Sequence, residues 1–544
     1  MFHRARSLLL CVLVAAGSGA CATTTQGHVN LPRPASVRKA FEQLKGNGGT
    51  TGVVSLTDNA AAWATRWQLV TSARKSVDLS TFIFDDDVFG FALLGALTER
   101  ARAGVKVRML LDGRGSLGLA SSLLGRDYLQ EMVETGKVDV HIYNPPLDEL
   151  VGALLKLDAV RITAGSHNKI LVVDDATAIV GGRNVNSHYF ATLDEDAGAV
   201  ADADLVLDGR KVVAEVKDIM VREFSSWKHD NVAADAINFS PQLDELLMFA
   251  GAMDTWVRGE IEGSDASSLV AALEQAARKR IDHRPDDGTL DKVRARLRAL
   301  VGFPSVRGTL PIRNVRREQV DVRVVATLSV ARAVKSNAVT DAMLRAIGGA
   351  RREIVLQSPS FILNPPLLLA LQEASARGVA ITLFTNGPSS SDSKLALSLF
   401  IDSWPELMAR IPTLRIFTER SKQMQHAKRA VFDDDLSFVG TYNLDPFSTK
   451  LNSETVIAVW SATLAARIRD ELKAHQVGMD EYLIARNEDG SARRHPDDHP
   501  KKGQVVVVWG PRDQVSAELI TELENVKGLM TSVQNLWNFD VVTW

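Results

Sequence analysis

Cysteine is almost absent from this sequence. Of its 544 residues only Cys11 and Cys21 are cysteines, and both lie within the N-terminal segment. A disulfide framework therefore cannot hold the body of the chain, which must be stabilised by its own hydrophobic cores. The length predicts two or three domains.

The sequence also lacks an excess of charge and a long apolar run in its body. Its 63 basic and 66 acidic residues give a formal net charge of -3, so we do not expect the broad positive field of a nucleic-acid-binding protein, and nucleic acid is not expected as a partner. After the N-terminal segment no stretch is apolar for long enough to cross a bilayer. The composition is that of a globular protein.

The first 21 residues have the pattern of a secretory signal. Arg4 and Arg6 precede an apolar run at 8–14, and small residues then lead to Cys21. Gly19-Ala20-Cys21 is similar to the bacterial lipobox, which predicts lipidation of Cys21, while cleavage at Ala22 by the ordinary signal peptidase stays open. We therefore expect an exported, membrane-associated protein, anchored in the cell envelope through Cys21, with residues 22–58 as a linker.

From about residue 59 helical and strand-like patterns alternate, and the same order occurs twice. The first copy predicts helices at 61–73 and 89–103 and strands at 76–84, 105–112 and 138–143; the second predicts helices at 338–350 and 367–377 and strands at 353–357, 379–384 and 413–417. Self-similarity on this scale predicts two homologous α/β/α sandwich domains, at 59–255 and 324–480.

Two segments fall outside the repeat. Residues 256–323 are rich in arginine and predict a helical insertion, either a solvated one or one with a basic face for anionic lipid headgroups. The extension at 481–544 contains a β-like run at 505–509 and a helix at 516–526, but its pattern does not indicate a role.

Each half carries one copy of the motif H-x-K-x4-D. The first copy is His167, Lys169 and Asp174, and the second is His426, Lys428 and Asp433. Six residues separate each aspartate from a glycine that begins a short segment ending in asparagine. This segment is Gly181-Gly182-Arg183-Asn184 in the first copy and Gly440-Thr441-Tyr442-Asn443 in the second. If the motif lies on a strand, its histidine and lysine share a face, and a hairpin turn at the aspartate returns the glycines and asparagine to them.

This set of side chains suits the cleavage of a phosphodiester. One imidazole attacks phosphorus while the other acts as acid and base. The lysines, together with Asn184, Asn443 and Gly182, are predicted to bind the phosphate oxygens. No metal or other cofactor is required by this scheme. The two aspartates, assigned to the catalytic set, fit a structural role in a turn equally well.

These motifs resemble those of the phospholipase D superfamily, over most of residues 60–480, and look most like bacterial cardiolipin synthases of the C type. The resemblance implies two domains packed around one shared active site, with His167 as the nucleophile and His426 as the acid and base. It also implies Glu454 and Asp202 as residues that orient the histidines; an exposed strand start explains Asp202 and Asp204 equally well.

The expected function is phosphatidyl transfer through a phosphohistidine, with phosphatidylglycerol or phosphatidylethanolamine as substrate at a membrane surface. A hydrolytic phospholipase D is the first alternative, a phosphodiester nuclease the second, and a non-catalytic scaffold the last. The sequence does not indicate the acceptor alcohol or the oligomeric state.

Overall fold

The structure is a computed structural model that describes residues 33–44, 46–120, 126–144, 165–225, 229–232, 243–263, 265–312, 317–328, 337–391, 393–516, 518–519 and 521–525. The predicted signal segment and Cys21 lie outside these residues. The chain divides into two compact units. The N-terminal unit lies within residues 47–320, and the C-terminal unit contains the described residues before 47 and from 321 onward.

The N-terminal unit is built on a mixed sheet in the order β1-β8-β6-β5-β2-β3-β4-β9. Only the pairs β2–β3 and β3–β4 are parallel. The strands are β1 (Gly48–Leu56), β2 (Ser76–Thr81), β3 (Lys106–Asp112), β4 (Val138–Tyr143), β5 (Ile170–Val173), β6 (Thr177–Gly181), β8 (Asp204–Leu207) and β9 (His229–Asn231).

The C-terminal unit repeats this sheet strand for strand and adds one strand at its edge. Its order is β10-β17-β16-β15-β11-β12-β13-β18-β19, again with two parallel pairs, β11–β12 and β12–β13. The strands are β10 (Glu318–Thr327), β11 (Glu353–Gln357), β12 (Ala380–Thr385), β13 (Leu414–Glu419), β15 (Lys428–Phe432), β16 (Leu436–Gly440), β17 (Glu454–Trp460), β18 (Met479–Ile484) and β19 (Val507–Trp509). The predicted repeat is confirmed.

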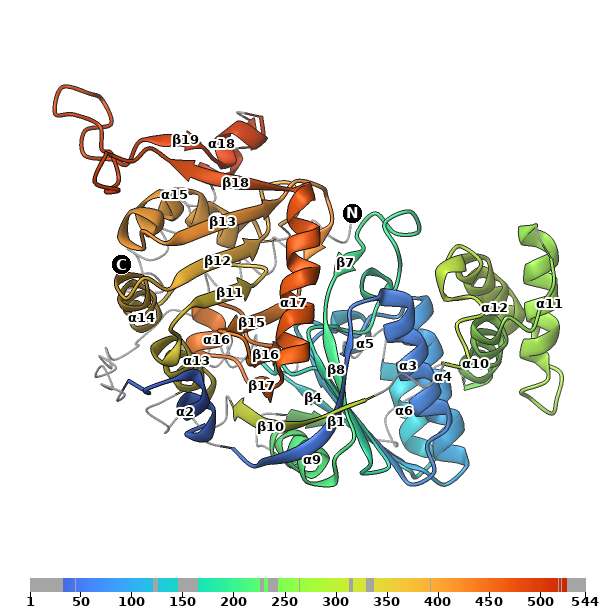
Figure 1. Ribbon diagram of the computed structural model, residues 1–544. Helices are drawn as coiled ribbons and strands as arrows, with labels where there is room; N and C mark the ends of the chain where they lie inside the picture. Colours follow the sequence, from blue (N-terminus) through green and yellow to red (C-terminus); the bar gives the residue numbers. More distant parts are fainter. Residues whose placement is uncertain are drawn as a thin grey trace, which may run out of the picture. The chain divides into compact units, whose positions relative to one another are not determined.

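Helices cover both sheets, as the mixed α/β prediction requires (Figure 1). In the N-terminal unit α9 (Arg210–Phe224) packs on β1, β2, β5 and β6, and α4 (Val88–Arg102) packs beside α3 (Asn59–Thr71) and on β3. In the C-terminal unit α17 (Ala462–His475) packs on β15 and β16, and α13 (Ala338–Gly349) packs beside α14 (Pro365–Ala376). Further helices of the two units are α6 (Arg126–Glu134) and α15 (Lys394–Arg410).

The predicted linker at 22–58 is partly wrong, because its described residues contain ordered elements. Ser36 accepts a hydrogen bond from the Lys39 N–H and caps α2 (Val37–Glu42), and the buried Phe41 of α2 joins the core of the C-terminal unit. β1 then pairs with β8 at the edge of the N-terminal sheet. A capped helix with an apolar face and a hydrogen-bonded strand are not properties of a linker.

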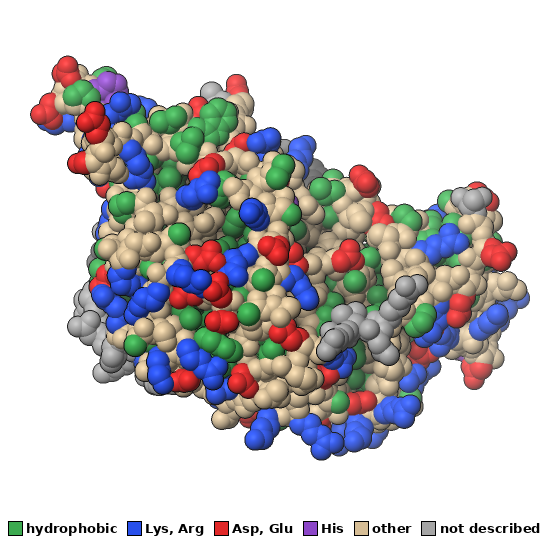
Figure 2. All heavy atoms as spheres, in the orientation of Figure 1, with side chains coloured by type: hydrophobic (Ala, Val, Ile, Leu, Met, Phe, Trp, Pro, Cys, Tyr) green, Lys and Arg blue, Asp and Glu red, His purple; other side chains and the backbone are tan. Residues whose placement is uncertain are grey.

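The predicted insertion is helical, and it belongs to the N-terminal unit. Its helices α11 (Ala266–Arg278) and α12 (Asp287–Leu300) pack on α10 (Leu243–Arg258). The arginines that predicted a basic face are largely paired with acids: Arg278 and Arg294 with Glu274, Arg280 with Glu99 and Asp254, Arg296 with Glu245, and Arg317 with Asp208. On the face shown in Figure 2 acidic and basic side chains are interspersed. This pairing favours the solvated insertion over a lipid-binding face.

The boundary predicted at residue 480 falls inside β18, which pairs with β13 and so completes the repeated sheet. β19 then pairs with β18, and the short helix α18 (Pro511–Gln514) follows it. In the described part of the chain no helix is both long and apolar enough to span a bilayer.

Candidate active site

Both motifs lead into hairpins of the same register. β5 pairs with β6 and β15 with β16, and a turn at each motif aspartate joins the strands. The backbone at Asp174 and Asp433 has a φ of 54° and 51°, the left-handed conformation that aspartate tolerates in tight turns. The predicted hairpins are therefore confirmed.

The histidines themselves do not lie on these strands, which corrects one step of the sequence argument. β5 begins at Ile170, after Lys169, and β15 begins at Lys428, so both histidines lie just before a strand. Neither histidine is fixed by the strand ladder that follows it. Other contacts must set its orientation.

Each motif lysine folds back on its own histidine. Lys169 Nζ donates to the His167 carbonyl oxygen at 2.8 Å, and Lys428 Nζ donates to the His426 carbonyl oxygen at 2.5 Å. Lys428 Nζ also lies 2.9 Å from His426 Nε2. Both histidines are 8% exposed and both lysines 4% exposed. Each unit thus presents an imidazole and an ammonium group together in a nearly dry environment, where an anion is bound more strongly than in water.

The N-terminal motif has two neighbours that the sequence analysis missed. The ring of Phe82 lies edge-on to His167, with centroids 5.3 Å apart, and Lys169 Nζ lies 5.3 Å from the centroid of the same ring. Asn168 Nδ2 donates to the wholly buried Glu223 at 2.8 Å. In the sequence, the one feature that could have pointed to Phe82 was its position near the end of a predicted strand.

The two motif aspartates bind backbone N–H groups, which favours the structural role in a turn over the catalytic one. The Asp174 carboxylate accepts N–H bonds from Arg74, Lys75 and Ser76, and Asp433 accepts them from Arg351, Arg352 and Glu353. Each aspartate closes the turn at the end of its strand remote from the histidine. The sequence left this structural role open.

These contacts perturb the acidity of Asp174. Burial acts to raise its pKa, but the N–H groups of residues 74–76 outweigh burial and the pKa is lowered. The carboxylate is therefore kept ionised as a hydrogen-bond acceptor.

The backbone N–H of Gly182, which was predicted to bind phosphate, is bonded within the protein. Its N–H donates to the Ala203 carbonyl oxygen at 3.0 Å, and a Cβ at residue 182 would collide with the Asp202 carboxylate. A Cβ at Gly440 would likewise collide with the Thr455 carbonyl oxygen. These glycines allow close approach of the next strand.

Asp202 and Glu454 occupy equivalent positions. Gly181 pairs with Asp204, and Gly440 pairs with Val456, so each acid lies two residues before the partner of its glycine. Both are buried, which excludes the exposed strand start considered for Asp202 and Asp204. Glu454 accepts hydrogen bonds from Thr441 Oγ1 and, at 2.6 Å, from Ser448 Oγ. The shared register supports one role for both acids.

The two motif asparagines differ in their contacts. Asn184 Oδ1 accepts from the Ile83 N–H at 3.0 Å, and Asn184 Nδ2 donates to the Tyr189 hydroxyl at 2.8 Å. One further N–H of the Asn184 amide remains for a phosphate oxygen. Among the described residues no hydrogen-bond partner reaches the buried Asn443 Oδ1. Because an amide oxygen only accepts hydrogen bonds, a phosphate oxygen could be bound only by the N–H groups of the Asn443 amide.

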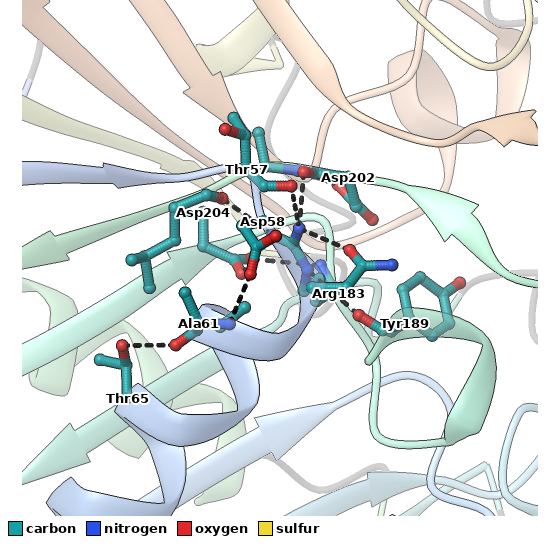
Figure 3. A network of polar contacts seen from close by, with 12 residues as sticks. Thr57, Asp58, Ala61, Thr65, Arg183, Tyr189, Asp202 and Asp204 are labelled. Atoms are coloured by element: carbon teal, nitrogen blue, oxygen red, sulfur yellow. Dashed lines mark hydrogen bonds and ion pairs between the residues drawn. The ribbon is translucent and has the colours of Figure 1, made fainter. Parts of the chain in front are cut away.

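Arg183, which stands between Gly182 and Asn184, is a structural residue (Figure 3). Its guanidinium bonds Asp204 at 2.9 Å and the carbonyl oxygens of Leu56, Thr57 and Asp202. Burial lowers the pKa of the neighbouring Arg66, while its ion pair with Asp204 opposes this. This buried network joins the start of α3 to β8 beside the motif.

In the described part of the chain no group of three or more His, Cys, Asp or Glu side chains is arranged to hold a metal ion. Each motif, within its own unit, presents imidazole, ammonium and amide groups. Such a set can attack a phosphodiester, transfer protons and bind the anionic oxygens.

Comparisons with known proteins agree with this chemistry. The family described as cardiolipin synthase, PLD-like domain, matches residues 67–222 and 343–476. Cardiolipin synthase C of Escherichia coli K12 is 27% identical over 440 residues, which cover 77% of this chain and 84% of that protein. An uncharacterised protein of Helicobacter pylori is 23% identical over 449 residues, which cover 80% of this chain and 81% of that protein.

A solved structure has the same fold. The phosphatidylserine synthase of Haemophilus influenzae superposes with a TM-score of 0.57 at 12% identity, covering 92% of this chain and 99% of that one. The structure of this chain is the sole source for the contacts of the motif aspartates and for the neighbours Phe82 and Glu223.

Proposed function

Because the chain belongs to the family of cardiolipin-synthase, phospholipase-D-like domains, a family of phospholipid-modifying enzymes, we propose that it is a phosphatidyltransferase that acts through a phosphohistidine. The observation that carries the proposal is the repeated His–Lys pair, buried at the same register in two units of the same topology. The similarity to cardiolipin synthase C supports a phospholipid as donor.

The proposed reaction has two displacements at one phosphorus atom. His167 attacks the phosphorus of the donor, which forms a P–N bond and breaks the P–O bond to the headgroup, and His426 gives its proton to the departing alkoxide. His426 then takes a proton from the hydroxyl of the acceptor, whose oxygen attacks phosphorus and releases His167. The proton count is restored after each cycle.

The other groups of the site bind and orient. Lys169 and Lys428 hold the anionic oxygens, and Asn443 and Asn184 supply amide N–H groups. Glu454 and Asp202 orient the histidines. We further propose phosphatidylglycerol or phosphatidylethanolamine as the donor and a glycerol-headed lipid as the acceptor, at a membrane surface.

The test uses vesicles of phosphatidylglycerol, with or without phosphatidylethanolamine, and mass spectrometry of the lipid products. Wild-type protein is expected to form cardiolipin, and His167→Ala and His426→Ala are expected to lower the rate by at least ~10³-fold, since each removes a positioned nucleophile or acid–base group. His283→Ala, which changes an exposed histidine bonded to Asp244, is the matched control and should keep full activity.

Two results would change the proposal. Formation of phosphatidic acid alone would make water the acceptor and the protein a hydrolase. Full activity in His167→Ala or His426→Ala would exclude the mechanism in which both histidines act on one phosphorus atom. With a donor labelled in its phosphate, denaturation in alkaline detergent, where a P–N bond is stable, should leave label on wild-type protein and none on His167→Ala.

A further inference from the structure

Asp112 and Asn386 occupy the same place in the two units. Ser80 pairs with both Leu110 and Ile170, and Gln357 pairs with both Phe384 and Arg429. Ile170 and Arg429 each follow the motif histidine by three residues, so Leu110 and Phe384 are equivalent positions. Two residues further on, at the carboxyl ends of β3 and β12, the chain has Asp112 in one unit and Asn386 in the other.

Asp112 holds the chain immediately before His167. Its side chain is wholly buried, and Oδ2 accepts the N–H of Ser166 at 2.9 Å. Its other oxygen accepts the N–H of Arg114 at 3.0 Å. The carboxylate therefore joins the end of β3 to the entry of the histidine segment.

Asn386 holds the equivalent point before His426. Asn386 Oδ1 accepts the N–H of Gln425 at 2.7 Å, and Nδ2 donates to the Gln425 carbonyl oxygen at 2.9 Å and to the Pro359 carbonyl oxygen at 3.0 Å. Both backbone groups of Gln425 are thus bonded to one side chain.

We infer that Asp112 and Asn386 are positioning residues for His167 and His426, an inference that rests on the proposed function. The histidines precede β5 and β15, so the sheet does not fix them. A side chain at the end of a neighbouring strand instead supplies the missing hydrogen bonds. Displacement of a reacting group by about 1 Å can cost ~10²-fold in rate, so this anchoring bears directly on turnover.

The difference between aspartate and asparagine follows from the neighbours. The backbone groups at Asp112 are N–H donors, those of Ser166 and Arg114, which an acceptor-only carboxylate satisfies. Asn386 faces one N–H and two carbonyl oxygens, which require an acceptor and a donor. Proline stands at position 388, equivalent to Arg114, and has no N–H to offer.

The first experiment measures kcat and KM of Asp112→Ala and Asn386→Ala. Each is expected to lower kcat ~10- to 100-fold with less than about a threefold change in KM, because substrate groups are untouched while a histidine is displaced. Asp58→Ala and Asn364→Ala are matched controls, since these residues cap α3 and α14 and touch neither motif. Unchanged kcat in both alanine variants, or equal losses in the controls, overturns the inference.

Asn386→Asp separates hydrogen bonding from volume. The substitution keeps the shape of the side chain but turns a carboxylate oxygen toward two carbonyl oxygens. We expect its kcat to be at least as low as that of Asn386→Ala. A wild-type kcat in this variant overturns the inference.

A measurement without substrate distinguishes this inference from the proposed function. The imidazole resonances of ¹³C-labelled His426 are expected to shift or broaden in Asn386→Ala and to stay in place in Asn364→Ala. If they do so while wild-type protein transfers no phosphatidyl group, the positioning role stands and the proposed function fails. If they stay in place in an active protein, the positioning role fails.

Discussion

Asp174 accepts N–H bonds from three consecutive residues at the start of β2, and Asp433 does the same before β11. At the scale of single residues, these bonds indicate that the two motif carboxylates stabilise the turns of the two hairpins. The histidine and lysine of each motif are left as its reactive part.

We predict that Asp174→Ala lowers stability and spares chemistry. The loss of charge-assisted bonds to half-buried N–H groups should cost about 1–2 kcal/mol of unfolding free energy, while kcat per folded molecule stays within about tenfold of wild type. Urea unfolding and specific activity measure the two quantities. A loss of kcat as large as that of His167→Ala would return Asp174 to the catalytic set.

A pH-dependent contact lies close to the N-terminal motif. The hydrogen bond from His188 to Asp196 raises the pKa of His188 above its ordinary value of 6.5. Because the folded-state pKa is the higher one, the resulting stabilisation is fully present below pH 6.5 and is lost as pH rises through the raised value.

His188→Asn should therefore lower Tm more at pH 5.5 than at pH 9. Thermal unfolding of wild type and variant at both pH values measures the difference. Asp196 stays ionised over this range because its own pKa is lowered, first by the His188 hydrogen bond. An equal Tm difference at the two pH values would show that the pair does not titrate as described.

At the scale of secondary-structure elements, close approach of neighbouring strands explains the glycines of both motifs. The chain stays close to β8 after Gly181, where the Gly182 N–H bonds the Ala203 carbonyl oxygen and Gly182 leaves room for the carboxylate of Asp202. β16 and β17 are also close at Gly440, where a Cβ would collide with the Thr455 carbonyl oxygen. Of these glycines, Gly182 is the one that leaves room for a buried acid.

Gly182→Ala is expected to displace Asp202. Overpacking should cost about 1–3 kcal/mol of unfolding free energy, and kcat should fall because Asp202, which we propose orients a histidine, would move. Gly136→Ala, where the structure leaves open space for a methyl group, is the control for substitution of glycine by alanine. Gly136 has a positive φ of 71°, so its variant measures backbone strain without a collision. A normal kcat in Gly182→Ala would show that catalysis does not depend on the room that Gly182 leaves for Asp202.

At the scale of the whole molecule, we propose that the chain is exported and anchored in the cell envelope through lipidated Cys21. Support comes from the charged, apolar and small-residue pattern of the first residues, which lie outside the described part. A single acyl chain gives only marginal membrane binding, so full anchoring requires the several chains of a lipoprotein or a further contact.

Cys21→Ser tests this anchoring. Wild-type protein expressed in a bacterial host should incorporate labelled palmitate and sediment with membranes, whereas the variant should carry no label. Mass spectrometry of the mature N-terminus separates lipidation of Cys21 from cleavage near Ala22. Equal labelling of both proteins would exclude Cys21 as the lipidation site.

Much of the fold was predictable because its signals are local. The strand at 353–357 and the strand at 138–143 were predicted with the observed bounds, and the other predicted elements of the repeat differ from α3, α4, β2, β3 and their counterparts by a few residues at the ends. The buried linker helix was not predicted, since α2 is short and is held by its contact with α13.

The sequence alone determined the repeat, the family resemblance and the two His–Lys pairs, because periodicity and motif spacing are properties of neighbouring residues. Tertiary structure decided the roles of Asp174, Gly182 and Arg183 and revealed Asp112 and Asn386. The bond from Asp112 to Ser166 spans 54 residues, and that from Asn386 to Gln425 spans 39. No local sequence pattern predicts such hydrogen-bond partners, because their contact depends on the order of the strands in each sheet.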